Sequence, residues 1–319
     1  MRIFCVITTH TARHLQHCLA GVLWQADPFH GVVVSSDRDD PTILDTAREA
    51  VQRHASSAHP VKEPSVRLPG LAVTMRPHQG ESRQGQVRNN GVRTLDARHR
   101  LRDDDAIVFL DGDIVLHPDA AAQHSSMLAE SDAVLAFRAP LTREATDGIE
   151  LRGLADFERA WPADAQAALS KRAGRYRRSA MLARLGGRHI GFVKPHKPKL
   201  ISCHFSCRVG ALRRVNGFDE RYEGHGFEDD DLGKRLHALR QPRARVAIGV
   251  DRIRAMHLWH ASRQADDLLC SPAYERFTRS DVPVRSELGL DAPRDQPESV
   301  TTILDAGPAG ADFTNGRPC

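Results

Sequence analysis

Long apolar runs, paired cysteines and aromatic side chains are all scarce in this chain of 319 residues. No stretch approaches the roughly 20 consecutive apolar residues that a helix needs to cross a bilayer, which argues against a membrane span. The six cysteines are too few and too scattered for a disulfide framework, so we expect a reducing, cytoplasmic compartment. Cys203 and Cys207 flank His204, but the second cysteine pair that a zinc site would need is missing.

Acidic residues are missing from one long segment. The whole chain has 45 basic and 41 acidic residues, a net charge of +4, yet residues 171–199 contain ten lysines or arginines and no acid. Such a run is often a solvated helix face. The alternatives are contact with an acidic or phosphorylated acceptor, or with an anionic membrane surface that the protein binds peripherally. Because only Tyr176 and Phe192 in this segment could stack on bases, we expect no nucleic-acid partner.

Short apolar runs alternate with helical patterns through the first 140 residues. We predict strands at 3–7, 31–34, 71–75, 106–110 and 133–137, and helices at 15–23, from Pro41, at 84–95 and at 118–128. Strand–helix–strand units joined by short loops indicate an α/β fold with a mostly parallel, doubly wound sheet. In such sheets, ligands bind beyond the carboxyl ends of the strands.

The alternation stops near Leu141. Residues 151–185 have an irregular, basic helical pattern, residues 199–207 are strand-like, and Asp229–Leu239 is a clear helix. From Asp281 the chain is rich in Pro, Asp, Gly and Ser, so we expect residues 281–319 to form a loosely ordered tail.

The first chemically suggestive group is Asp111-Gly112-Asp113, directly after the predicted strand 106–110. Two carboxylates one residue apart can both approach one small cation, because the glycine lets the backbone bend sharply between them. Carboxylate oxygens suit Mg²⁺ or Mn²⁺. A solvated acidic turn is the alternative interpretation.

The second group is Glu228-Asp229-Asp230-Asp231, at the start of a predicted helix. One or two acids there are explained by the helix dipole, but four are not. Crowded carboxylates raise one another's pKa values, which favours a general base among them. Glycines at 217, 224 and 226 permit a tight loop just before the helix.

The run from Asn216 to Leu236 resembles the acceptor-side motif shared by inverting glycosyltransferases of family two and the animal beta-galactosyltransferases. In those enzymes a Gly-Phe-Asp-Glu segment precedes a Gly-Trp-Gly loop and a Glu-Asp-Asp helix start. Three further segments follow the family's order, namely 6–10, 88–91 and 109–113. The resemblance covers residues 3–260 except 141–199. It implies a GT-A fold and a single catalytic domain over 1–280, with a nucleotide-sugar-binding half (1–140) and an acceptor-side half (141–280).

The resemblance also implies roles for individual residues. The binding pocket for the nucleotide-sugar donor, most simply a UDP-sugar, would be lined by Thr8, Thr9, Asp37, Arg88 and Asp111. Asp113, with Asp111, would ligate a divalent metal, Mn²⁺ or Mg²⁺, at the diphosphate. Asp229 would deprotonate the acceptor hydroxyl of a glycan, a lipid-linked molecule or another alcohol. Glu228, Asp230, His225 and Gly226 would contact sugar hydroxyls. This chain departs from the family where Thr8 and Thr9 replace a proline and an aromatic residue, and where His225 replaces the loop tryptophan.

Relatives place a histidine after a late strand as a further metal ligand, and Met256–His260 contains two candidates. In a strand, His257 and His260 would point to opposite faces, so we expect only one to reach the metal, with His257 favoured. An exposed surface histidine is the alternative.

Two other classes of function remain open from the residues alone. One is a homologue that binds sugar nucleotides without turnover, and the other is a nucleic-acid-binding protein that uses residues 171–199.

Overall fold

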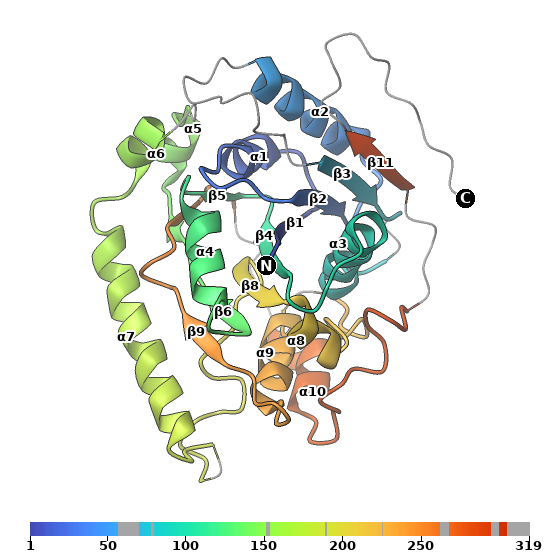
Figure 1. Cartoon of the computed structure of the whole chain (residues 1–319), viewed down its shortest axis with the longest axis vertical. Helices are drawn as coiled ribbons and strands as arrows, with labels where there is room; N and C mark the ends of the chain where they lie inside the picture. Colours follow the sequence, from blue (N-terminus) through green and yellow to red (C-terminus); the bar gives the residue numbers. More distant parts are fainter. Residues whose placement is uncertain are drawn as a thin grey trace.

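The computed structural model describes residues 1–56, 70–77, 80–150, 154–188, 190–224, 226–261, 268–294 and 300–304. Within these residues, a central sheet has the strand order β11-β3-β2-β1-β4-β8-β6-β9 (Figure 1). Its strands are β1 (Ile3–Thr9), β2 (Gly31–Ser36), β3 (Gly70–Met75), β4 (Ala106–Asp111), β6 (Ala133–Leu135), β8 (His204–Arg208), β9 (Val246–Ile248) and β11 (Val300–Leu304). The neighbours β3, β2, β1 and β4 are all parallel. The α/β class and the mostly parallel sheet predicted from the sequence are therefore confirmed.

The described helices and turns flank this sheet. They are α1 (Leu15–Leu23), α2 (Pro41–Ser56), α3 (Gln84–His99), α4 (Ala120–Leu128), α5 (Arg143–Asp147), α6 (Leu154–Ala160), α7 (Ala165–Arg184), α8 (Val209–Arg214), α9 (Glu228–Ala238), η1 (Leu268–Cys270) and α10 (Pro272–Thr278). The basic, irregular pattern at 151–185 thus corresponds in its described part to α6 and α7. The strand-like stretch 199–207 forms a strand only from His204.

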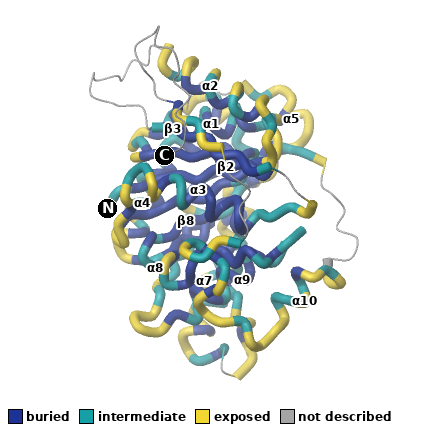
Figure 2. Tube along the Cα trace, turned by 90° about the vertical axis from the view of Figure 1, so that its right-hand side faces the viewer, coloured by how far each residue is buried: buried dark blue, intermediate teal, exposed yellow. Residues whose placement is uncertain are grey.

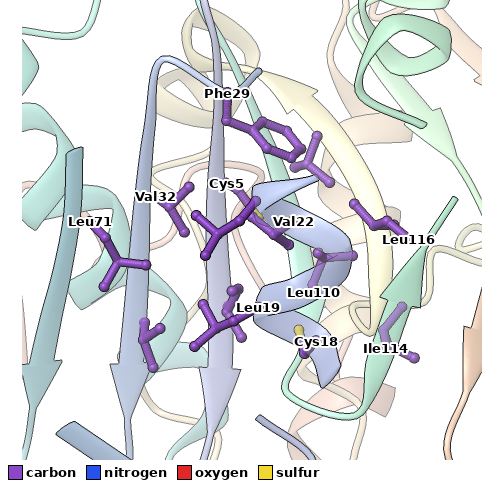
Figure 3. Close-up of a cluster of buried hydrophobic side chains, with 14 of the residues drawn as sticks. Cys5, Cys18, Leu19, Val22, Phe29, Val32, Leu71, Leu110, Ile114 and Leu116 are labelled. Carbon is purple, nitrogen blue, oxygen red and sulfur yellow. The ribbon is translucent and has the colours of Figure 1, made fainter. Parts of the chain in front are cut away.

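Alternate residues of the buried strands face two different helical layers. Cys5, Ile7 and Val34 pack under α1, α2 and α4, whereas Phe4, Val6 and Val33 pack under α3, α8 and α9. Figure 3 shows α1 placing Cys18, Leu19 and Val22 against strand residues such as Cys5 and Val32. Burial on both faces explains why these strands are continuous apolar runs, and Figure 2 shows them as a buried centre between more exposed helices.

A small second sheet extends the carboxyl edge of the central sheet. It has the order β5-β10-β7, with β5 at Ile114–Leu116, β10 at Ala255–His257 and β7 at Ala139–Pro140. β5 follows β4 after a two-residue turn, and its Ile114 is paired with His257. This pairing brings the end of β10 to the Asp-Gly-Asp turn.

Parts of the predicted tail belong to the folded body. β11 pairs antiparallel with β3 at the edge of the central sheet. Before it, the Ser286 amide donates to Val215 O (3.0 Å) and the Leu290 amide to Asn216 O (3.0 Å). The prediction of a loosely ordered tail is therefore corrected for residues 281–294 and 300–304, because their backbone groups pair with the sheet edge and the loop before α9. The remaining tail residues lie outside the described part of the chain.

Strands from both predicted halves of the chain share the central sheet, since β8 and β9 come from the second half. Among the described residues, none of the helices combines the length and apolarity needed to cross a membrane.

Candidate functional site

The carboxyl ends of β1, β2 and β4 meet at one edge of the sheet, and the predicted donor-binding residues lie there. Thr8 is in register with Asp111 on one side and Ser35 on the other. The Gly112 amide donates to Thr8 O (2.8 Å), and a Cβ at Gly112 would lie 2.9 Å from the Thr9 Cβ. Only glycine therefore lets the turn approach β1 this closely. The buried Thr8 hydroxyl has no hydrogen-bond partner among the described residues.

Asp37, which follows β2, is buried and held by several donors. Its carboxylate pairs with Arg76, accepts from the Ser82 hydroxyl (2.9 Å) and accepts from the Arg83 amide (3.3 Å). Arg76 directly follows β3, the position where polar residues at this sheet edge are expected, so the strand-end rule would have found it. The segment 82–83 in turn contacts the loop before α9, because the Gly224 amide donates to Ser82 O (2.8 Å).

Arg88 connects the two acidic groups of the sequence. It is buried on α3 and forms ion pairs with Asp111 (3.0 Å) and with Glu228 (3.1 Å), which is 140 positions away along the chain. Burial opposes the charge on Arg88, but Asp111 and Glu228 outweigh it and raise the pKa of the guanidinium. The structure therefore brings three of the predicted site residues into direct contact.

Replacing Arg88 by Met should strongly destabilise the protein, because Asp111 and Glu228 would both lose the buried cation that they share. We expect the free energy of unfolding, measured by urea denaturation, to fall by about 3 kcal/mol. The matched control is Arg48→Met, which removes a more exposed partner of Asp45 and should cost at most about 1 kcal/mol. Equal losses in the two variants would contradict this account of Arg88.

Asp113, His257 and His260 form a cluster beyond the small sheet. The Asp113 Oδ2 atom lies 3.4 Å from His257 Nε2 and 3.0 Å from His260 Nε2. One ligand atom from each residue can be chosen such that all three lie within 4.8 Å of one another. Burial alone would raise the pKa of the Asp113 carboxyl, but hydrogen bonds from His257 and His260 hold it well below its usual range. The hydrogen bond to Asp113 likewise raises the pKa of His260.

The sequence favours only one of these histidines as a ligand of the metal, yet both lie close to the Asp113 carboxylate. Strand alternation ends at His257, the last residue of β10, so it does not govern His260. Beyond it, the Leu258 amide donates to Asp113 O (3.0 Å) and the Trp259 amide to Thr146 Oγ1 (2.8 Å), which turns the chain back towards the carboxylate. His14 also donates to Trp259 O (3.0 Å) and helps to hold this turn.

The donor set of this cluster fits a divalent metal. Two imidazoles and one carboxylate suit Mn²⁺-like ions. The buried Asp113 Oδ1 atom has no hydrogen-bond partner within the described ranges, which leaves it free to bind a cation. Asp111, which the resemblance also assigns to the metal, is not part of this cluster, and its Oδ1 accepts from Arg88 instead.

The four acids at the start of α9 have different surroundings. Glu228 pairs with Arg88, Asp230 pairs with Lys199 (2.9 Å), and Asp231 is buried against Arg235 (2.7 Å). The loop before them reaches the helix through left-handed conformations at Gly224, Gly226 and Phe227. His225, a predicted substrate residue, lies outside the described residues, whereas Gly226 is placed directly before this helix start.

Asp229 differs from its neighbours because backbone amides, and not a cationic side chain, donate the hydrogen bonds described for its carboxylate. Its oxygens accept from the amides of Asp230 (2.7 Å) and Ser202 (3.4 Å). Burial raises the pKa of this carboxyl, the Lys199 charge opposes that rise, and the Asp230 charge adds to it. A partly buried carboxyl with a raised pKa is well suited to accept a proton. Sequence reasoning missed Lys199 as part of this site, although it ends the basic segment.

Cys203 lies close both to the Asp113–His257–His260 cluster and to the carboxylates at the start of α9. Its carbonyl accepts from the Asp111 amide (3.2 Å). Burial raises the pKa of its thiol, and after the opposing Arg138 charge the next contributions come from Asp111, Asp229 and Asp113. These three carboxylates therefore all lie near the start of β8. The cysteine itself is buried, as expected for a small hydrophobic residue.

Comparison with known proteins gives one family match, to a model described as the N-terminal domain of galactosyltransferase, over residues 191–260. This range contains the acidic start of α9 and the two histidines near Asp113, His257 and His260. No curated protein matches the sequence of this chain.

Distant structural likenesses include three solved glycosyltransferases. S. aureus TarS 1-349 in complex with UDP-GlcNAc has 14% identity and a TM-score of 0.47, with 82% of this chain and 60% of that chain covered. The catalytic domain of Drosophila beta1,4galactosyltransferase 7 has 12% identity and a TM-score of 0.47, with 97% and 96% covered. Glucosyl-3-phosphoglycerate synthase from Mycobacterium tuberculosis, in complex with Mn²⁺, UDP and glucosyl-3-phosphoglycerate, has 13% identity and a TM-score of 0.43, with 86% and 77% covered. The chain thus spans about 60% of the length of the TarS fragment.

Proposed function

We propose that this protein is a metal-dependent glycosyltransferase that moves a sugar from a nucleotide-diphospho-sugar, most simply UDP-linked, to an acceptor hydroxyl with inversion at the anomeric carbon. The observation that carries the proposal is the joining of two chemistries at one sheet edge. A cluster that can hold a metal includes Asp113, two residues after Asp111. Asp229, a partly buried carboxyl with a raised pKa, follows Glu228, and Arg88 forms ion pairs with both Asp111 and Glu228. The family match over 191–260 supports it.

Asp113, His257 and His260 would hold the divalent ion. When bound, the ion would neutralise the charge that develops on the departing nucleoside diphosphate. The Thr8 hydroxyl, which has no hydrogen-bond partner among the described residues, would line the sugar-nucleotide site at the same edge. Thr9 follows it, with its hydroxyl bonded to Thr11. Asp37 is held by Arg76 and Ser82, which keeps a carboxylate at the end of β2 beside the expected nucleotide.

Asp229 would accept the proton of the acceptor hydroxyl at a carboxylate oxygen. Lys199 lies close enough to oppose the rise in its pKa and pairs with Asp230. Glu228, Asp230, His225 and Gly226 would orient the sugar and acceptor hydroxyls. Direct displacement needs one such base and no covalent enzyme intermediate, which is why a single carboxylate suffices for inversion.

A donor screen tests this function. Purified protein is incubated with nucleotide-sugars in the presence of Mn²⁺ or of a chelator, and products are identified by mass. We expect Mn²⁺-dependent release of the nucleoside diphosphate from a UDP-sugar, by transfer or slow hydrolysis. The proposal fails if no nucleotide-sugar is turned over or bound under these conditions. Binding without turnover would instead favour a non-catalytic sugar-nucleotide-binding protein.

A further inference from the structure

The basic segment 171–199 divides into two parts in the structure. Several of its cations contact the folded body: Arg172 Cζ lies 3.8 Å from the centre of the Phe137 ring, Arg177 pairs with Asp251 (2.6 Å), and Lys199 pairs with Asp230. The last turn of α7 and the residues that follow it form the second part. In Figure 1 this end of α7 projects at the bottom of the molecule. We call residues 181–188 and 190–194 the α7 tip.

The α7 tip exposes large apolar side chains. Of the eleven large hydrophobic residues that are exposed in the described part of the chain, five lie here: Met181, Leu182, Leu185, Ile190 and Phe192. Phe192 is 81% exposed, Leu185 75% and Ile190 68%. Leu185, the C-cap residue of α7, follows Met181 by four residues and Leu182 by three, a spacing that places the three side chains near one another. A cluster of this kind marks a binding surface, whereas apolar residues that are exposed singly do not.

The exposure is built into the turn. The Gly187 amide donates to Leu182 O (2.8 Å) and the Val193 amide to Gly187 O (3.0 Å), so the chain folds back on the end of α7. Val193 is buried by this turn while its neighbour Phe192 points out. A Cβ at Gly187 would lie 2.6 Å from Leu182 O, which shows how closely the turn packs. The larger apolar residues are therefore presented outward by an ordered turn.

The charge around these side chains has one sign. Arg184, Arg188 and Lys194 lie in the α7 tip, and residues 165–218 contain no aspartate or glutamate. The local field is visible at His196, where burial and then the charges of Lys197, Lys194 and Lys199 lower the pKa to about 4. Two copies of such a surface would repel each other. An apolar centre with a cationic rim is instead complementary to an anionic lipid surface, in which rings and aliphatic chains enter the interface and cations meet the headgroups.

We propose that the α7 tip docks on an anionic bilayer, with Leu185, Ile190 and Phe192 inserted at the interface and Arg184 and Lys194 at the level of the phosphates. This goes beyond the proposed function, because it concerns where the protein binds and does not depend on turnover.

Sedimentation with lipid vesicles tests this docking surface. Vesicles of phosphatidylcholine alone are compared with vesicles that also contain phosphatidylglycerol. We expect binding to the anionic vesicles only, weakened by salt. The variant Leu185→Ser/Phe192→Ser should reduce the partition coefficient at least about tenfold. The variant Arg184→Gln/Lys194→Gln should reduce it about fivefold per charge.

Matched controls come from exposed residues outside the α7 tip. Leu154→Ser/Leu269→Ser removes two exposed apolar side chains, and Arg53→Gln/Arg159→Gln removes the same net charge. Both should bind vesicles like the unaltered protein, and circular dichroism verifies that all variants are folded. A second readout is Phe192→Trp, whose fluorescence should shift to the blue with anionic vesicles and be quenched by brominated lipid.

Three outcomes would overturn the proposal. The first is that the unaltered protein does not bind anionic vesicles, which would point to a protein partner for this surface. The second is a tip variant that binds like its matched control. The third is lipid-independent self-association that Leu185→Ser/Phe192→Ser abolishes, which would make the surface a contact between copies of the chain. None of these readouts involves glycosyl transfer, so failure here is distinguishable from failure of the proposed function.

Discussion

Replacing Asp229 by Asn should lower kcat for sugar transfer by about 10³-fold, because the variant cannot accept the proton of the acceptor hydroxyl. The donor KM should change little, since the metal cluster and the Arg88 ion pairs do not include Asp229. The fold should be retained, because an amide oxygen can still accept from the Asp230 amide and burial opposes the charged form of Asp229. Steady-state kinetics with the donor found by the screen measures both constants.

The pH profile gives the same prediction an independent readout. Because burial raises the pKa of Asp229, the wild-type rate should fall on acidification at a higher pH than an ordinary aspartate would give. The residual activity of Asp229→Asn should lack this acidic limb. The matched control is Glu223→Gln, which neutralises a half-exposed acid in the loop before α9 that pairs with Arg294 and should leave kcat nearly unchanged.

An unchanged kcat in Asp229→Asn would contradict the role of this residue as base. A different result is possible. If the wild-type protein and the Asp229→Asn variant both bound the donor and neither turned it over, the chain would be better described as a sugar-nucleotide-binding protein. An unchanged kcat would show only that Asp229 is not the base. Binding without turnover in both proteins would show that the chain does not catalyse the transfer.

Mn²⁺ binding should require both His257 and His260. Each single change to Ala should weaken Mn²⁺ affinity at least about tenfold, and Asp113→Asn should weaken it further, because each residue contributes a ligand atom to one cluster. The affinity is measured by titration of Mn²⁺ in the presence of UDP, with free ion followed by electron paramagnetic resonance. Transfer activity should fall in parallel and recover partly at high Mn²⁺ concentration.

His30→Ala is the matched control for these variants. His30 is exposed and immediately precedes β2, at the edge of the sheet opposite to the site. It should bind Mn²⁺ like the wild-type protein. If one of His257→Ala and His260→Ala also bound Mn²⁺ normally, only the other histidine would be a ligand, and the inference drawn from the shared contact with Asp113 would be wrong.

Much of the fold could be predicted because its signals are local. The strands at 3–7 and 106–110 were recognisable from continuous apolar runs, and their burial on both faces explains those runs. The Asp-Gly-Asp turn followed from its position after a strand. β11 could not be predicted, because a short exposed edge strand in a polar segment has no strong periodic pattern and depends on pairing with β3.

The site was predictable in its residue types and less so in its contacts. The family resemblance suggested Asp229 as the base among four adjacent acids, but the differences in partners that support this choice come from Arg88, Lys199 and Arg235. Lys199 could not be assigned to the site from the sequence because it lies far along the chain from Asp230, with which it pairs, whereas Arg76 could have been found from its position after β3. That both histidines lie close to Asp113 does not follow from strand alternation, because β10 ends at His257.

By itself, the sequence determined that the chain builds a mostly parallel α/β sheet and that carboxylates stand at a strand end and at a helix start. Those features depend on residues a few positions apart, which share one strand or one helical turn. Only the tertiary structure decided that both histidines meet Asp113, that Arg88 links Asp111 to Glu228, and that the basic segment parts into an anchored stretch and the α7 tip. These are contacts, or the absence of contacts, between distant segments, and they follow from the path of the chain.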